Sequence, residues 1–295
     1  GETITLLTGM TLTETGIITV DKTIILDMNG KSISSTVPDI ITVESAWDLT
    51  IKGNWTIKGP DYGENFDSRV LIWVSWKLTI EDGTLIAKWS WSDWMYGVYV
   101  YGNGTAIFGK NDWTWPTITS HFAAIWENHM TAPANVIVYW GTYTANATPT
   151  NNEWWSYFCA PVYAAWAWTI NIQWWTFNGY YGISDRYADV EQDLTIGWWT
   201  FNASSNIAIF VDEVNGSNST ADRTIKATTS GLSKPAWYVW QQENDCSYQL
   251  YNENDFVAEI GGKWYTTLSW AFAAAHDGET ITLLTGMTLT ETGII

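Results

Sequence analysis

The sequence predicts an all-β chain folded as a β-solenoid, a stack of coils in which the strands of successive turns lie side by side. The first observation behind this prediction is the alternation of apolar and polar residues. From Glu2 to about Ser230, short runs alternate Ile, Leu or Val with Thr or another polar residue, and Gly, Asn and Asp separate the runs. A period of two is typical of strands, and helical periodicity is nearly absent here.

The second observation is a degenerate template of an apolar, a polar and an apolar residue, a short turn, and a Thr. Its five copies are Leu49-Thr50-Ile51 with Thr56, Leu78-Thr79-Ile80 with Thr84, Val136-Ile137-Val138 with Thr142, Ile170-Asn171-Ile172 with Thr176, and Leu194-Thr195-Ile196 with Thr200. The longest gap, from Thr84 to Thr142, is expected to hold two coils, with Gly104-Thr105 between them. A coil cannot bury its apolar face alone, whereas stacked coils form one continuous core.

The third observation is a perfect repeat. Gly1–Ile18 recurs without a change as Gly278–Ile295, a spacing of 277 residues from Gly1 to Gly278. An unchanged copy at a fixed spacing indicates one period of a tandem array together with the start of the next. We therefore expect neighbouring copies of the same repeat, joined head to tail, to be the main partners.

Four segments follow from these patterns. Gly261-Gly262 predicts a two-residue hairpin turn, and Thr266 or Thr267 can cap a short helix that ends at Asp277-Gly278. The apolar residues of that helix, at i, i+3, i+4 and i+7, are Leu268, Ala271, Phe272 and Ala275. The predicted segments are the β-helix (1–230), a linker or terminal coil (231–254), the capping hairpin and helix of the next repeat (255–277), and the first strands of that repeat (278–295).

This division makes the two ends of the chain unequal. We expect Thr3–Leu7 to be a frayed or partner-covered edge, because no hairpin and helix precede it in this chain. The hairpin and helix near Phe256–Ala275 are expected to close the base of Thr280–Leu284 instead.

The letters TTLxxAFAAAxDGETITLL, joined to TLTETGIITVDKTIILDMNGKSI, resemble the start of right-handed parallel β-helix domains of the pectate-lyase-like type. In particular they are similar to tandem domains of large bacterial surface and adhesin-like proteins. The resemblance implies an extracellular or cell-surface location. Enzymes on this fold use clustered carboxylates, or Ca²⁺ with a basic residue. No position of this chain matches those motifs, so no catalytic residue is assigned.

Composition excludes some partners. With 31 Asp+Glu against 13 Lys+Arg, the net charge of −18 repels nucleic acid and anionic membranes. No apolar run is long enough to insert this segment into a membrane. Cys159 and Cys246 show no metal-ligand spacing, and both a single disulfide and two free thiols are compatible with the sequence.

The best carboxylate cluster is Asp185, Asp189 and Asp193, between two predicted coils. These residues are candidate Ca²⁺ ligands, or two of them an acid and base for glycosidic cleavage; the alternative is a solvated loop, with no cofactor at all. A second acidic loop holds Asp61, Glu64 and Asp67 without the spacing of an EF-hand. His121 and His129 do not define a metal pair.

Tryptophan is the unusual residue, with 23 Trp against 9 Phe and 15 Tyr. The slot before the template Thr holds either Trp or Gly, namely Trp55, Gly83, Gly141, Trp175 and Trp199. A turn favours Gly there and penalises a bulky residue. One hypothesis is that many Trp stand for UGA codons that a bacterial source reads as glycine. A second is a sugar-binding ladder, with Trp174 and Trp175 over Trp198 and Trp199. A third is that the tryptophans are real and have no special role.

Two functions remain open from the sequence. The first is a structural and adhesive repeat unit of a long extracellular or cell-surface filament or stalk, with weak contacts to glycans or other cells. The alternative is a secreted polysaccharide lyase or glycoside hydrolase on the same scaffold, with Asp185–Asp193 as its site.

Overall fold

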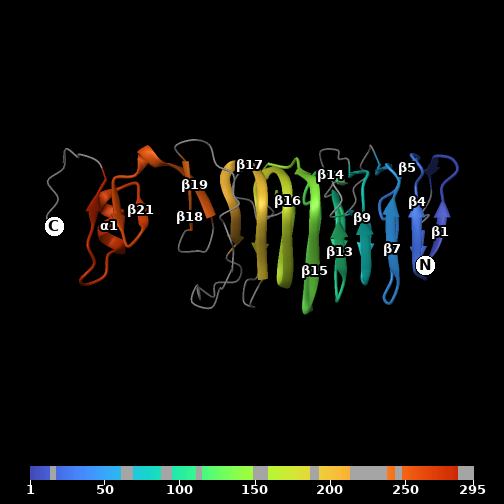
Figure 1. Cartoon of the computed structure of the whole chain (residues 1–295), viewed down its shortest axis with the longest axis horizontal. Helices are drawn as coiled ribbons and strands as arrows, with labels where there is room; N and C mark the ends of the chain where they lie inside the picture. The colour runs from blue at the N-terminus through green and yellow to red at the C-terminus, as the bar shows by residue number, and fades with distance from the viewer. Residues whose placement is uncertain are drawn as a thin grey trace.

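The structure is a computed structural model, and it describes residues 1–13, 18–60, 69–87, 95–110, 115–148, 159–186, 193–212, 238–242 and 248–284. The chain forms an elongated stack of coils (Figure 1), with the N-terminus at one end and a hairpin with a short helix at the other. Strands of successive coils pair in parallel. The predicted all-β solenoid with one short helix near its C-terminus is confirmed.

Each short strand pairs with the third strand after it, so every coil adds one rung to each of three parallel ladders. The first ladder contains β1 (Glu2–Thr5), β4 (Ile24–Asp27), β7 (Asp48–Lys52), β10 (Lys77–Ile80) and β13 (Thr105–Phe108). The second contains β2 (Met10–Leu12), β5 (Ser32–Ser35), β8 (Thr56–Lys58), β11 (Thr84–Ile86) and β14 (Thr117–Ser120). The third contains β3 (Ile18–Val20), β6 (Ile41–Val43), β9 (Arg69–Val74) and β12 (Met95–Val100).

Three long strands continue all three ladders. They are β15 (Ile125–Ala145), β16 (Val162–Arg186) and β17 (Asp193–Asp212). Successive parts of β15 pair with β12, β13 and β14, so one uninterrupted strand runs around the coil. β16 stacks on β15, and β17 stacks on β16.

The register confirms the template and corrects one part of it. Template Thr residues lie directly over one another, in the order Thr56, Thr84, Thr117, Thr142, Thr176 and Thr200. The gap between Thr84 and Thr142 does hold an additional coil. Its marker is Thr117, however, and the prediction of Thr105 was wrong, because Thr105 begins β13 and pairs with Lys77 of β10 in the first ladder.

The core lies inside the coils. Alternate residues of each strand point inward, as in β7, where Leu49 and Ile51 are buried while Thr50 is only partly buried. The same inward pair recurs in β10 as Leu78 and Ile80. These residues belong to one cluster that extends from Val20 to Ile209. The period-two pattern thus produces a core that is continuous along the rod.

The C-terminal part is built differently. β18 (Tyr238–Gln242) and β19 (Tyr248–Asn252) form an antiparallel pair on β17, within the segment predicted as a linker or terminal coil. A 3₁₀ turn at Glu253–Asp255 follows.

The cap, defined here as 256–275, then contains β20 (Ala258–Ile260), β21 (Lys263–Tyr265) and α1 (Leu268–Ala274). Gly261 and Gly262 make the hairpin turn at φ of 57° and 89°. Thr267 caps the helix, with its side chain accepting from Trp270 N at 3.2 Å. The predicted hairpin and helix are confirmed, but the helix ends at Ala274, with Ala275 as its C-cap, and not at Asp277-Gly278 as predicted.

Candidate functional sites

The first copy of the repeated segment forms the base of the solenoid. β1 pairs with β4 from Glu2↔Ile24 to Thr5↔Asp27, and Leu6 N donates to Asp27 O at 2.8 Å. In the described part of the chain, no strand pairs with the opposite edge of β1. Ile4 is 47% exposed and Leu7 is 82% exposed. The base is therefore an exposed edge, but it is a paired strand and not frayed, and its covering by a partner stays a prediction.

The second copy lies against the cap. β22 (Thr282–Leu283) pairs antiparallel with β20, in the register Ala258↔Leu283 and Glu259↔Thr282. Leu284 N extends this pairing by donating to Val257 O at 2.9 Å. The predicted closure of Thr280–Leu284 by the hairpin is confirmed. One sequence therefore occupies two different settings, at opposite ends of the rod (Figure 1).

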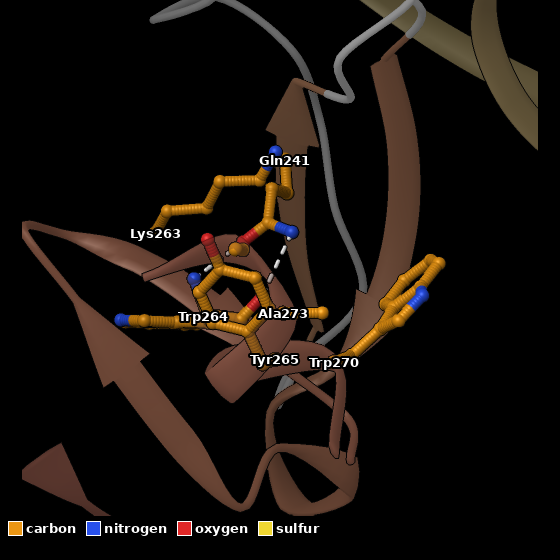
Figure 2. A pocket seen from close by; sticks show the side chains of 7 residues that line it. Gln241, Lys263, Trp264, Tyr265, Trp270 and Ala273 are labelled. Carbon is orange, nitrogen blue, oxygen red and sulfur yellow. Dashed lines mark hydrogen bonds between the residues drawn. The ribbon is translucent and has the colours of Figure 1, made fainter. Parts of the chain in front are cut away.

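A cavity of about 210 Å³ lies where β18 meets the cap (Figure 2). Gln241 bridges the two parts, because its amide accepts from Trp264 N at 2.8 Å and donates to Trp264 O at 2.9 Å. The other lining residues are Lys263, Tyr265, Trp270, Ala273 and Ala274. The described lining contains neither a carboxylate nor an imidazole, and its titratable groups are Lys263 and Tyr265. The contacts join the cap to the strands before it.

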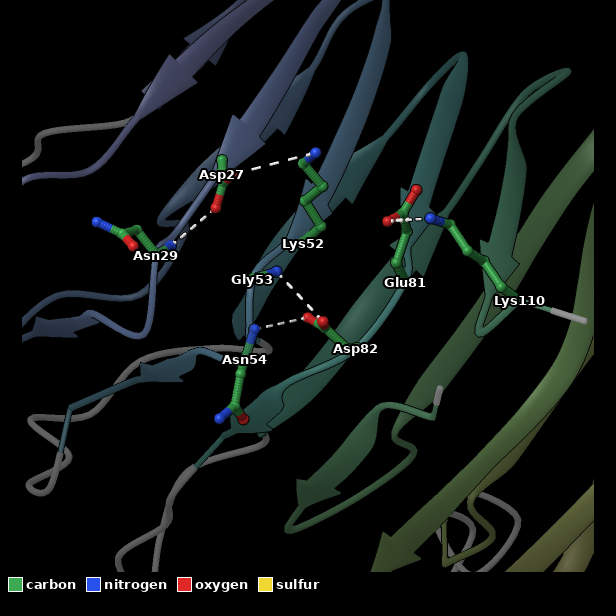
Figure 3. A network of polar contacts seen from close by, with 8 residues as sticks. All are labelled: Asp27, Asn29, Lys52, Gly53, Asn54, Glu81, Asp82 and Lys110. Carbon is green, nitrogen blue, oxygen red and sulfur yellow. Dashed lines mark hydrogen bonds and ion pairs between the residues drawn. The ribbon is translucent and has the colours of Figure 1, made fainter. Parts of the chain in front are cut away.

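Carboxylates at the corner between the first and second ladders bind turn amides (Figure 3). Asp82 accepts from Gly53 N at 3.2 Å and from Asn54 N at 3.0 Å, both in the preceding coil. Asp27 accepts from Asn29 N at 3.0 Å. These turns need the bonds because Gly53 and Asn54 adopt positive φ and leave their N–H groups outside the ladder. Here the acidic side chains hold coils together.

A row of polar side chains follows the outer face of the second ladder. Thr56, Thr84, Thr117, Thr142 and Thr176 are each half-buried and in register. A parallel row continues it, since Asn178 Nδ2 donates to Thr144 Oγ1 at 3.2 Å and Asn202 Nδ2 donates to Asn178 Oδ1 at 2.8 Å. We call these residues the hydroxyl–amide row. It offers uncharged donors and acceptors along the rod axis.

The four candidate sugar-binding tryptophans border this row. Trp174 pairs with Trp198 and Trp175 with Trp199, immediately before Thr176 and Thr200. Their backbones thus have the register that a ladder requires. Their side chains lie outside the described part of the structure.

At the Trp/Gly slot, the ring of Trp55 packs against the glycine of the next coil. Its side chain is only 2% exposed, and its indole N–H has no hydrogen-bond partner in the described part of the chain. A Cβ on Gly83, in the next coil, would lie 2.5 Å from the ring of Trp55. The ring therefore occupies the space left by a glycine at φ 91°.

Two of the three candidate metal ligands lie on different ladders. Asp185 pairs with Val211 on the third ladder, while Asp193 pairs with Thr169 on the first. Asp189 lies outside the described residues, as do Asp61, Glu64 and Asp67 of the second acidic loop. The part of the chain that the structure describes contains no group of three or more His, Cys, Asp or Glu that could hold a metal.

The remaining candidates are buried or outside the described part. Burial lowers the pKa of His121 to about 4, and its ring packs edge-on against Phe122. The side chain of His129 is outside the described part. Cys159 is a free, buried thiol, and burial raises its pKa to about 12, which keeps it protonated and unreactive. Cys246 lies outside the described residues.

Sequence reasoning missed an aromatic row on the third ladder. Trp73, Tyr99, Trp126 and Tyr163 are in register across four coils. The ring centroids of Tyr99 lie 4.9 Å from those of Trp73 and 4.4 Å from those of Trp126. Burial first, then the charge of Glu127, raises the pKa of Tyr99 to about 12. The rings pack on each other, which indicates a mainly structural role.

No family model, no curated protein and no solved structure matches this chain. The structure supports the β-solenoid alone, so the likeness to pectate-lyase-like and adhesin repeats stays a proposal. In the described residues, no helix is long and apolar enough to cross a membrane.

Proposed function

We propose that the chain is the structural and adhesive repeat unit of a long extracellular filament or stalk on a bacterial surface. The observation that carries the proposal is the placement of the repeated segment at both ends of the rod (Figure 1). Copies joined through that segment extend the rod along its own axis. Tandem copies also multiply weak contacts through avidity.

Glycans are the proposed ligands of this surface. The hydroxyl–amide row presents neutral hydrogen-bonding groups in register, and the backbone positions of Trp174 and Trp198 lie beside it. Sugars are recognised by such groups together with aromatic faces. Each coil offers few contacts, so the binding of one unit is weak and repetition provides the strength.

The arrangement of carboxylates favours this role over glycan cleavage. Acid and base catalysis on a glycosidic bond needs two carboxyl groups that face one another across the bond, at most about 10 Å apart. At the corner between the first and second ladders, Asp82 binds two turn amides and Glu81 binds Lys110, so these acids already have partners. The side chains of Asp185 and Asp193 lie outside the described part of the structure.

Incubation with uronate-containing and neutral polysaccharides tests the choice between adhesion and cleavage. We expect retention on a glycan array and no new reducing or unsaturated ends. The paired change Thr144→Val and Asn178→Leu should weaken retention, whereas Thr50→Val, on the first ladder, should leave it unchanged. Turnover that disappears in Asp189→Ala would replace this proposal with a lyase or glycosidase.

A further inference from the structure

We propose that the repeated segment is a strand shared by two partners, the cap behind it and the coil ahead of it. The base of the solenoid is then the docking surface for the cap of another copy of this chain, and the junction between copies is one continuous sheet. The inference rests on the proposed tandem array and defines how its units join.

The two pairings use opposite edges of the same strand. In the first copy, Leu6 N donates toward β4, to Asp27 O. In the second copy, Leu284 N donates toward β20, to Val257 O. Leu284 corresponds to Leu7, the residue after Leu6. Successive N–H groups of a strand point to opposite edges, so one strand can make both sets of bonds at once.

The side chains of the two copies are complementary in the same way. Ile4 occupies the inward register position of Leu26 but is 47% exposed, because no layer covers the base. Its counterpart Ile281 is partly buried against the small core of the cap. Conversely, Leu6 packs against the solenoid core, whereas its counterpart Leu283 is 56% exposed. Each setting buries what the other leaves open.

If one strand makes both pairings at once, the side chains equivalent to Ile4 and Leu6 are both covered, and neither pairing has to change. The small core of the cap, which contains Ala258 and Ala271, then lies beneath the counterpart of Ile4. The coil that follows covers the counterpart of Leu6. Such a head-to-tail contact is heterologous, because each copy uses different surfaces at its two ends, and it extends without closing.

Amide hydrogen exchange on the full chain and on a two-copy chain tests the shared strand. The two-copy chain consists of residues 1–295 followed by a second copy of 19–295. In the single chain, Leu6 and Leu284 amides should exchange slowly, and Leu7 and Leu283 amides fast. In the two-copy chain, Leu283 should also become slow, by about tenfold or more. A Leu283 amide that stays fast while Leu284 is protected would overturn the proposal.

A matched pair of variants tests the cap side. Leu284→Pro removes the donor to Val257 O, so amides of β20 and β22 should lose protection. Leu7→Pro makes the same change in the same local sequence, where the described chain shows no backbone bond for that amide, and should leave β4 unchanged. Equal effects of both variants would contradict the assignment of edges.

Small-angle scattering of the two-copy chain gives an independent readout. A shared strand predicts one straight particle with about twice the length of the single chain. Scattering from two bodies joined by a hinge would contradict the shared strand, but it would be compatible with an array that binds glycans without cleaving them. Glycan turnover would remove the adhesive function without affecting the exchange of Leu283, so the two failures are distinguishable.

Discussion

Gly83 should be intolerant of any side chain, for two reasons that can be measured separately. Its φ of 91° lies in the left-handed region, which costs an L-residue roughly 1–2 kcal/mol. An added Cβ would also lie 2.5 Å from the Trp55 ring, which is buried and cannot move freely. Overpacking of this kind costs about 1–3 kcal/mol. Gly83→Ala is therefore expected to lower the free energy of unfolding by about 2–5 kcal/mol.

A double-mutant cycle separates the two contributions. In a Trp55→Gly background the ring is gone, so Gly83→Ala should cost only the backbone part, about 1–2 kcal/mol. The measurement is urea unfolding followed by far-ultraviolet circular dichroism, with Trp55→Ala as a second background in case Trp55→Gly folds poorly. An equal cost of Gly83→Ala with and without the Trp55 ring would refute the steric argument.

Four further predictions concern single groups. Asp82→Ala should lower stability by about 2 kcal/mol in urea unfolding, because two turn amides lose a charged acceptor, and Asp82→Asn should lose less. Burial lowers the pKa of His121 to about 4, so between about pH 6.5 and 4 the unfolded chain binds a proton that the folded chain does not, and the free energy of unfolding falls as the pH drops. His121→Gln should reduce this loss by about 1–2 kcal/mol, allowing for partial exposure of the ring. Thr267→Ala should cost the cap about 1 kcal/mol, measured as faster amide exchange in α1 and not in the solenoid. Peptide mass spectrometry of the natural protein should find glycine at position 175, whereas tryptophan there would end the recoding hypothesis.

The fold could be predicted from the sequence because a solenoid repeats its local rules. The inward pairs Leu49 with Ile51 and Leu78 with Ile80 obey the same alternation, so the register followed from aligning the template. The alignment failed for one coil because its turn is longer: nine positions separate Phe108 from Thr117, against four between Val138 and Thr142. At that spacing Thr117 does not match the template.

The contacts between coils were less predictable, because they join residues that are distant in the sequence. Nothing in the sequence near Trp55 shows that Gly83 lies against its ring, and the sequence alone gives no steric reason for Trp and Gly to share one slot. The structure supplies one for this pair. Trp175 pairs with Gly141 on one side and with Trp199 on the other, and the side chains of both tryptophans lie outside the described part of the structure.

The aromatic row was missed for a related reason. Members such as Trp73 and Tyr99 are the central residues of triplets with an apolar residue on either side, Ile72-Trp73-Val74 and Val98-Tyr99-Val100. These triplets form a second template in the sequence. It differs from the first template because its central residue is aromatic, as at Trp73 and Tyr99. Stacking can be recognised only once the coil lengths are known, since those lengths determine which triplets face each other.

The weakest coil of the rod is the one that the tandem array would protect. Each coil contacts only its neighbours, so a terminal coil has half the support of an internal one. All four residues of β1 are exposed, whereas Ile24 and Leu26 of β4 are buried. In an array, a cap covers every internal base, and only one open base remains per filament. Amides of residues 279–282 in the two-copy chain should therefore exchange more slowly than the identical amides of residues 2–5. Equal exchange of the two copies would show that the cap gives the following coil no support.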